Sequence, residues 1–121
     1  MATLTPTLTL TSTDASSDSL ALSVTDSLTV GNPAVSVARQ EVSTSGQFNI
    51  LTAADNTGIS YVYVKNIDST NIITLKDDSA NNFLDLSPGE FAFFPVKGAI
   101  GLEATANVAA CILEYAYWTK A

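Results

Sequence analysis

The first thirty residues mostly alternate between apolar and hydroxyl side chains. In residues 2–11, leucine or proline fills the even positions from 4 onward and threonine fills the odd ones. The alternation returns at 20–30, after a turn-rich Asp-Ala-Ser-Ser-Asp sequence at 14–18. A period of two is typical of a strand with one apolar and one polar face. We therefore predict two strands here, followed by a turn at Gly-Asn-Pro, 31–33.

A third segment, 34–42, is less apolar. Arg39 and Glu41 share a strand face with Val35 and Val37. Charges that point inward protect the edge of a sheet from pairing with other chains. The pattern therefore predicts an edge strand.

Aromatic residues divide the chain in two. All ten lie after residue 47, whereas 18 of the 28 Ser and Thr residues lie in the first 45 positions. Aromatic side chains bury the largest areas, so we expect the core to come from residues 46–121 and residues 1–45 to form a ribbon or arm. Alternation and turn residues predict six strands in the second part, at 47–51, 59–67, 71–76, 90–96, 99–104 and 108–118.

Helical periodicity is nearly absent from the sequence. Eight or nine short strands, separated by turn residues in a chain of 121 residues, are typical of an antiparallel sandwich. We predict an all-β fold, a single jelly-roll-like β-sandwich domain over residues 1–121.

The composition narrows the range of functions. The chain has no His, which removes the usual general base and the commonest zinc ligand. Its net charge of −7 opposes binding to nucleic acid and to anionic membrane surfaces. We expect a protein that is not an enzyme, needs no cofactor and binds neither nucleic acid nor membrane. The single Cys111 lies in an apolar run and is expected to be a buried thiol.

The segment 77–85 resembles a calcium-binding loop only in part. Oxygen-bearing side chains fill ligand positions at 77, 79, 81 and 85, but Asn82 replaces the required Gly and Pro88 replaces the bidentate Glu. A solvated turn explains the same residues, because Asp and Asn tolerate turn geometry. We therefore predict no metal site.

Tyrosines cluster at alternating positions on two predicted strands. A platform for a glycan or a protein partner is one interpretation, and packing in the core or in an interface is the other. The candidate platform residues are Tyr61, Tyr63, Tyr117 and Trp118.

The apolar face of the N-terminal ribbon must be covered, because an aromatic-free ribbon hardly forms a core alone. It either forms the second sheet of the same sandwich or reaches a neighbouring subunit, and the two interpretations are compatible. The candidate interface residues are Leu4, Leu8, Leu10, Leu20, Leu22 and Val24.

Several stretches resemble small virion proteins of tailed bacteriophages. They are Val-Tyr-Val-Lys-Asn-Ile at 62–67, Asn-Ile-Ile-Thr-Leu at 71–75, Phe-Leu-Asp-Leu-Ser-Pro-Gly-Glu-Phe at 83–91 and Leu-Glu-Tyr at 113–115. The opening, rich in Thr, Ser and Leu, is similar to those of cyanophage structural proteins. The resemblance implies a head decoration (cement) protein, with a neck, tail or fibre component as the alternative.

The same resemblance implies where the protein acts and with what. Its partners would be further copies of itself, with a trimer as one candidate, and the major capsid protein or another virion protein. It would be made in the host cytoplasm and lie on the outer surface of the head.

Residues 1–13 contain no Lys or Arg, so no export signal is expected. A carbohydrate-binding jelly roll is the competing function from another class.

Overall fold

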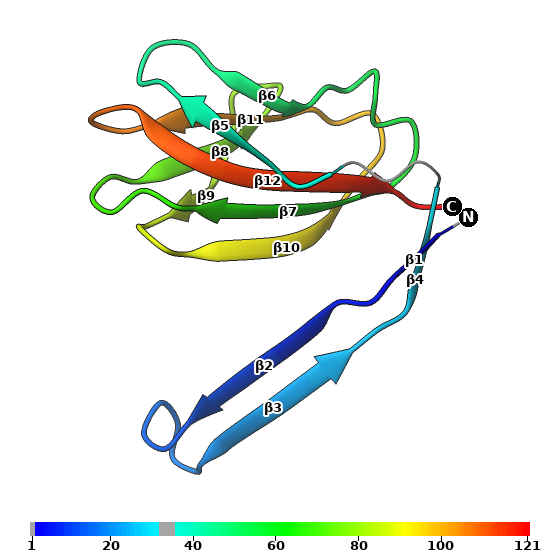
Figure 1. Ribbon diagram of the computed structural model, residues 1–121, viewed down its shortest axis with the longest axis vertical. Helices are drawn as coiled ribbons and strands as arrows, with labels where there is room; N and C mark the ends of the chain where they lie inside the picture. The colour runs from blue at the N-terminus through cyan, green and yellow to red at the C-terminus, as the bar shows by residue number, and fades with distance from the viewer. Residues whose placement is uncertain (1, 32–35) are drawn as a thin grey trace.

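The computed structural model describes residues 2–31 and 36–121, and this part of the chain is all-β (Figure 1). Four strands precede the sandwich: β1 (Ala2–Leu4), β2 (Thr7–Ser12), β3 (Leu20–Thr25) and β4 (Leu28–Val30). Eight strands form it: β5 (Ala38–Val42), β6 (Phe48–Leu51), β7 (Ser60–Asn66), β8 (Ile73–Asp77), β9 (Asn82–Leu86), β10 (Phe91–Val96), β11 (Leu102–Ala106) and β12 (Cys111–Thr119). The predicted turn at 31–33 and the predicted strand start at 34–35 lie largely outside the described residues.

The sandwich consists of two four-stranded antiparallel sheets. Sheet I has the strand order β10-β7-β12-β5, and sheet II has the order β6-β11-β8-β9. The chain changes sheet at every connection except the β8–β9 hairpin. This is the strand order of a jelly roll, and it confirms the predicted fold class.

The core lies between the two sheets and draws on alternate positions of each strand. Val62 and Val64 of β7 face Ile73 and Leu75 of β8 among the fully buried side chains. At its rim, Phe48 of sheet II meets Tyr115 of sheet I edge to face, with ring centroids 5.3 Å apart. The aromatic-containing part of the chain therefore supplies most of the core, as predicted.

Strand β5 belongs to the sandwich, although the sequence predicts residues 38–42 as part of the ribbon. It is the edge strand of sheet I, pairs with β12 and buries Val42 completely. The predicted edge position is correct. The charges, however, point outward, because Arg39 and Glu41 are exposed on the outer face while Val42 points inward.

Strand β9 was not predicted. Its pairing with β8 shifts in register between Leu75 and Lys76, so the strand does not alternate regularly. The irregularity leaves Phe83 half exposed, with its ring edge to face against Phe94 of β10. Residues 2–11 and 20–30 each form two strands rather than one. Together these differences raise the number of strands in the described part of the chain to twelve.

The N-terminal strands form an arm that leaves the sandwich (Figure 1). Among the residues that the structure describes, β1 pairs only with β4, and β2 only with β3, as separate two-stranded sheets. The arm breaks at Pro6, whose carbonyl accepts a hydrogen bond from the amide of Asp26, because proline cannot donate to the ladder. The interpretation of the ribbon as the second sheet of the sandwich is therefore wrong.

Backbone hydrogen bonds fix the base of the arm to the end of β12. The amide of Gly31 donates to the carbonyl of Thr119 (2.8 Å), and the amide of Ala121 donates to the carbonyl of Thr29 (3.0 Å). Val30, between these contacts, is buried and bridges to Lys120. The base is thus part of the folded body, whereas β2 and β3 extend away from it.

Candidate assembly surface

Aromatic side chains cover the outer face of sheet I. Tyr61 and Tyr63 point outward from β7 because Val62 and Val64 point into the core. Antiparallel pairing places Phe93 beside Tyr63 on one side and Trp118 beside Tyr61 on the other. We call the following set the aromatic face: Tyr61, Tyr63, Phe91, Phe93 and Trp118. The rings of Tyr61 and Phe93 stack with centroids 6.2 Å apart.

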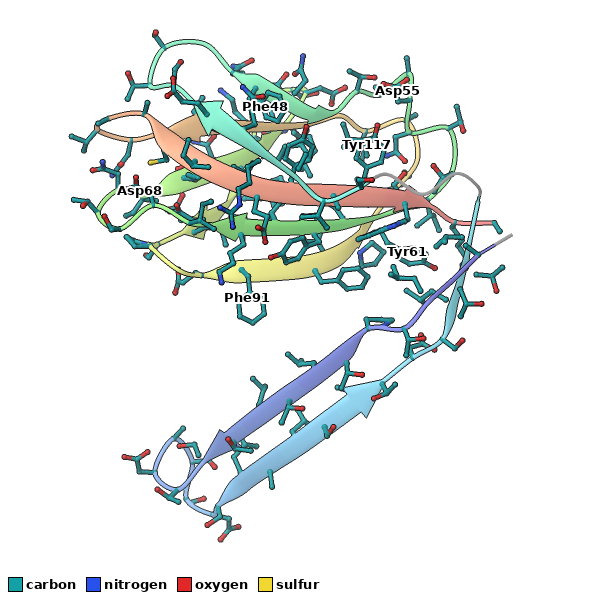
Figure 2. All side chains as sticks on the ribbon, in the orientation of Figure 1. Phe48, Asp55, Tyr61, Asp68, Phe91 and Tyr117 are labelled. Atoms are coloured by element: carbon teal, nitrogen blue, oxygen red, sulfur yellow. The ribbon has the colours of Figure 1, made fainter. Side chains whose placement is uncertain are left out.

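The structure divides the predicted platform between two faces of the sheet. Tyr61, Tyr63 and Trp118 share the outer face, but Tyr117 points inward with Tyr115 and packs against the core (Figure 2). Adjacent residues of a strand point to opposite faces, so Tyr117 and Trp118 cannot belong to one platform. The sequence does not predict Phe91 and Phe93 as part of the platform, because only the pairing of β10 with β7 brings them beside the tyrosines.

A polar network lies beside the aromatic face. The hydroxyl of Tyr63 donates to Oε1 of Glu114 (2.7 Å), and Nε of Arg39 donates to Oε2 of the same carboxylate (3.1 Å). Burial, together with the Glu114 charge, raises the pKa of Tyr63 to about 12. The pKa of Glu114 is lowered, most by the hydrogen bond from Tyr63 and next by the hydrogen bond from Arg39. The network links β5, β7 and β12 of sheet I, and both oxygens of its one carboxylate accept a hydrogen bond.

The arm presents an apolar stripe, which consists of Leu8, Leu10, Leu22 and Val24. Cross-strand pairing places Leu8 opposite Val24 and Leu10 opposite Leu22, so all four share one face of the hairpin. Each is between 42% and 52% exposed. On the other face, Thr7 and Thr25 join their hydroxyl groups at 3.1 Å. The predicted alternation is confirmed, but nothing in the described part of the chain covers its apolar side fully.

The two remaining predicted interface residues lie at the ends of the stripe. Leu20 is half-buried opposite Ser12, near the tip of the arm. Leu4 is half-buried opposite Leu28, in the base. They support the hairpin and contribute less free surface than the stripe.

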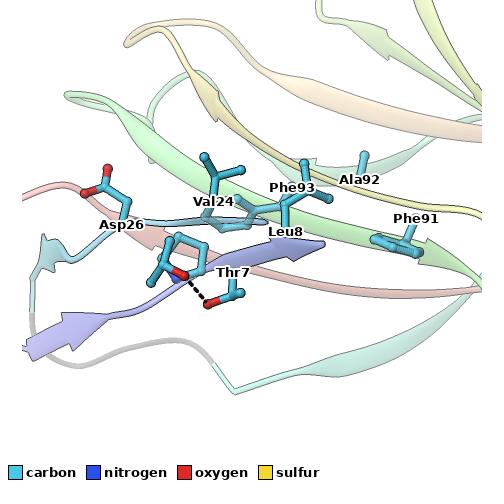
Figure 3. Close-up of a pocket in the computed structure, with 9 residues that line it drawn as sticks. Thr7, Leu8, Val24, Asp26, Phe91, Ala92 and Phe93 are labelled. Atoms are coloured by element: carbon cyan, nitrogen blue, oxygen red, sulfur yellow. Dashed lines mark hydrogen bonds between the residues drawn. The ribbon is translucent and has the colours of Figure 1, made fainter. Parts of the chain in front are cut away.

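A groove separates the arm from the aromatic face (Figure 3). Its volume is about 570 Å³. Leu8 and Val24 line one side, and Phe91 and Phe93 line the other. Two apolar surfaces therefore face each other across an open space.

The segment 77–82 forms a turn that uses its own acidic group. The Asp77 carboxylate accepts hydrogen bonds from the amides of Ser79 and Asn81 and from the Asn81 side chain, at 2.9 Å each. The bonds from Asn81, side chain first, lower the pKa of Asp77. Within residues 2–31 and 36–121, no group of three or more His, Cys, Asp or Glu residues is arranged to hold a metal ion.

Cys111 is a free, buried cysteine, as predicted. Burial raises the pKa of its thiol, which disfavours the reactive thiolate. Among the described residues, no helix is long and apolar enough to span a membrane.

Comparison with known proteins gives no relative: no family model, no curated protein and no solved structure matches the chain significantly. The arm, the groove and the aromatic face are therefore the features from which a function is inferred.

Proposed function

We propose that the protein is a non-enzymatic structural protein of a tailed-phage virion, which decorates and stabilises the outer surface of the head. The observation that carries the proposal is the arm, whose apolar stripe extends from the jelly roll without a cover. A small protein that exposes such a stripe gains stability by assembling. Contacts of this kind carry no ion pairs and are little affected by salt.

Two further features support a role in a particle. Jelly rolls of two four-stranded sheets occur in viral capsid domains, as well as in lectins. The stretches that resemble phage virion proteins form β7, β8 and β9, the turn into β10 and part of β12. A neck, tail or fibre component of the same particle is the alternative within this class, because the arm serves equally well there.

Particle binding tests the proposal. Heads prepared from a phage that lacks this protein are mixed with the purified chain and sedimented. We expect the chain to co-sediment in many copies per head and to raise the temperature at which the heads open. Heads that bind none of it and are equally stable without it contradict the decoration role, whereas binding confined to necks or tails supports the alternative.

The aromatic face favours a second candidate, a carbohydrate-binding module. Sugars stack on exposed aromatic rings. Phe91 and Phe93 are exposed on the outer face of sheet I and Trp118 is half-buried there, whereas Tyr61, whose ring stacks on Phe93, is itself buried.

A glycan array tests the second candidate. If the face binds sugar, the variant Trp118→Ala loses binding, whereas Tyr117→Phe, altered on the inner face, keeps it. A wild-type chain that binds no glycan on the array contradicts this candidate and leaves the decoration proposal in place.

A further inference from the structure

We propose that the apolar stripe of each arm packs on the aromatic face of a second copy of this chain. The inference rests on the self-assembly part of the proposed function and names the two surfaces involved. It does not depend on the virion, because both surfaces belong to the chain itself.

The arm needs a partner for its stripe. A two-stranded hairpin is at best marginally stable in water unless its apolar face packs against another layer. Within residues 2–31 and 36–121, β2 and β3 pair only with each other, and every residue of the stripe is more than 40% exposed. The hydroxyl-bearing face, in contrast, is well solvated. Only the apolar face of the hairpin therefore requires a partner surface.

The aromatic face needs a cover of the same kind. Phe91 is 63% exposed and Phe93 is 38% exposed, and both lie on β10, an edge strand of sheet I. Their neighbours on β7 and β12 add further ring surface. Aliphatic side chains such as Leu8 and Leu10 suit such a face because they fill the spaces between rings without bringing polar atoms.

The chain does not close its own groove. The base of the arm is fixed by hydrogen bonds to residues 119 and 121, and the space of about 570 Å³ remains between Leu8 and Phe93. Contact between two stripes from different arms would leave both phenylalanines exposed. An exchange of arms covers stripe and aromatic face with a single kind of contact, which is how reciprocal interfaces in closed dimers are built.

The charges do not oppose this arrangement. Residues 2–31 contain three Asp and no Lys or Arg, and the three Asp lie outside the strands and the stripe. On the receiving surface, Lys65 lies beside Phe91 in the β7–β10 register and opposite Glu114 in the β7–β12 register. This end of the sheet therefore carries both signs of charge, and the exchange depends on apolar contact rather than on ion pairing.

Disulfide trapping between two differently sized chains tests the inference. One chain carries Leu10→Cys and a size tag, and the other carries Phe91→Cys. We expect a mixed disulfide as the main product after the chains are mixed, refolded together and oxidised. Thr9→Cys, on the opposite face of β2, is the matched control and should give at least tenfold less product with the Phe91→Cys chain. Buried Cys111 should give none.

The other arrangements give different products. Disulfides only between two Leu10→Cys chains indicate arm-to-arm packing and overturn the inference. A chain that carries both cysteines and forms only an internal disulfide at high dilution indicates closure on its own face and also overturns it.

Sedimentation of full-length variants provides an independent measurement. The double variant Leu10→Ser, Leu22→Ser should raise the dissociation constant for self-association at least tenfold, whereas Thr9→Ala, Ser23→Ala, on the hydroxyl face, should leave it unchanged. A wild-type chain that stays monomeric at high concentration overturns arm exchange. The decoration proposal is judged separately, by binding to heads.

Discussion

Tyr63 and Glu114 are joined across two strands of sheet I: the phenol of Tyr63 donates a 2.7 Å hydrogen bond to Oε1 of Glu114. Arg39 donates to the other carboxylate oxygen from the edge strand β5. One carboxylate thus links β7, β12 and β5 on the outer face, beside the aromatic face. The pKa of Tyr63 therefore reports on this hydrogen-bond network.

The variant Glu114→Gln should lower the pKa of Tyr63 from about 12 towards the ordinary tyrosine value of 10. The carboxylate opposes formation of a second negative charge and accepts a hydrogen bond from the neutral phenol, and replacement by the amide removes the charge. A titration of phenolate ultraviolet absorbance measures the change, with Tyr63→Phe variants to isolate the contribution of this residue. An unchanged titration contradicts the role of Glu114.

Gly98 approaches the backbone of Gly58 so closely that a Cβ atom on Gly98 would lie 2.4 Å from the Gly58 carbonyl oxygen. Because the obstacle is backbone, Gly98→Ala should reduce the free energy of unfolding by about 2 kcal/mol, in the range found for overpacking. Gly58→Ala is the matched control, since its Cβ would meet no atom within 4 Å. Urea unfolding of both variants measures the difference, and equal stabilities would contradict the contact.

Asn56 is fully buried and holds the loop before β7 to the loop after β10. Its Nδ2 donates to the carbonyls of Lys97 (2.7 Å) and Ile100 (3.0 Å), and its Oδ1 accepts from Ser60 (2.8 Å). Asn56→Ala leaves these groups without a partner and should cost about 2–3 kcal/mol of stability. Exposed Asn49→Ala should change stability by less than about 0.5 kcal/mol. Denaturant unfolding gives both values.

Stability should fall in acid as the Asp77 carboxylate becomes protonated. Its pKa in the folded protein lies below its ordinary value of 3.8, because Asn81 and Ser79 hydrogen-bond the charged form. The folded state therefore binds fewer protons than the unfolded state, and this contribution is present above pH 3.8 and lost as the pH falls through the lower folded value. Unfolding measured across this range should show a shallower acid loss in Asp77→Ala. Ser79→Ala, which keeps the Ser79 amide that donates to Asp77, should keep the wild-type slope.

The sequence alone predicted the local features of the fold. Alternation of Leu with Thr located both halves of the arm and their apolar side, and Asp and Asn residues located the 77–82 turn. These features depend on backbone conformation and on side chains two positions apart, which are local properties. The all-β fold follows from them.

Only the tertiary structure decided which strands are neighbours and which faces point outward. Alternation shows that Tyr61 and Tyr63 share one face, and Tyr115 and Tyr117 another, but it does not say which of these faces the core. That depends on the pairing of β7 with β10 and β12, between residues far apart in the chain. The same long-range pairing brought Phe91 to the aromatic face and left the arm, although fully patterned for burial, outside the sandwich. Within one copy, the described residues leave the apolar side of the arm without a full cover.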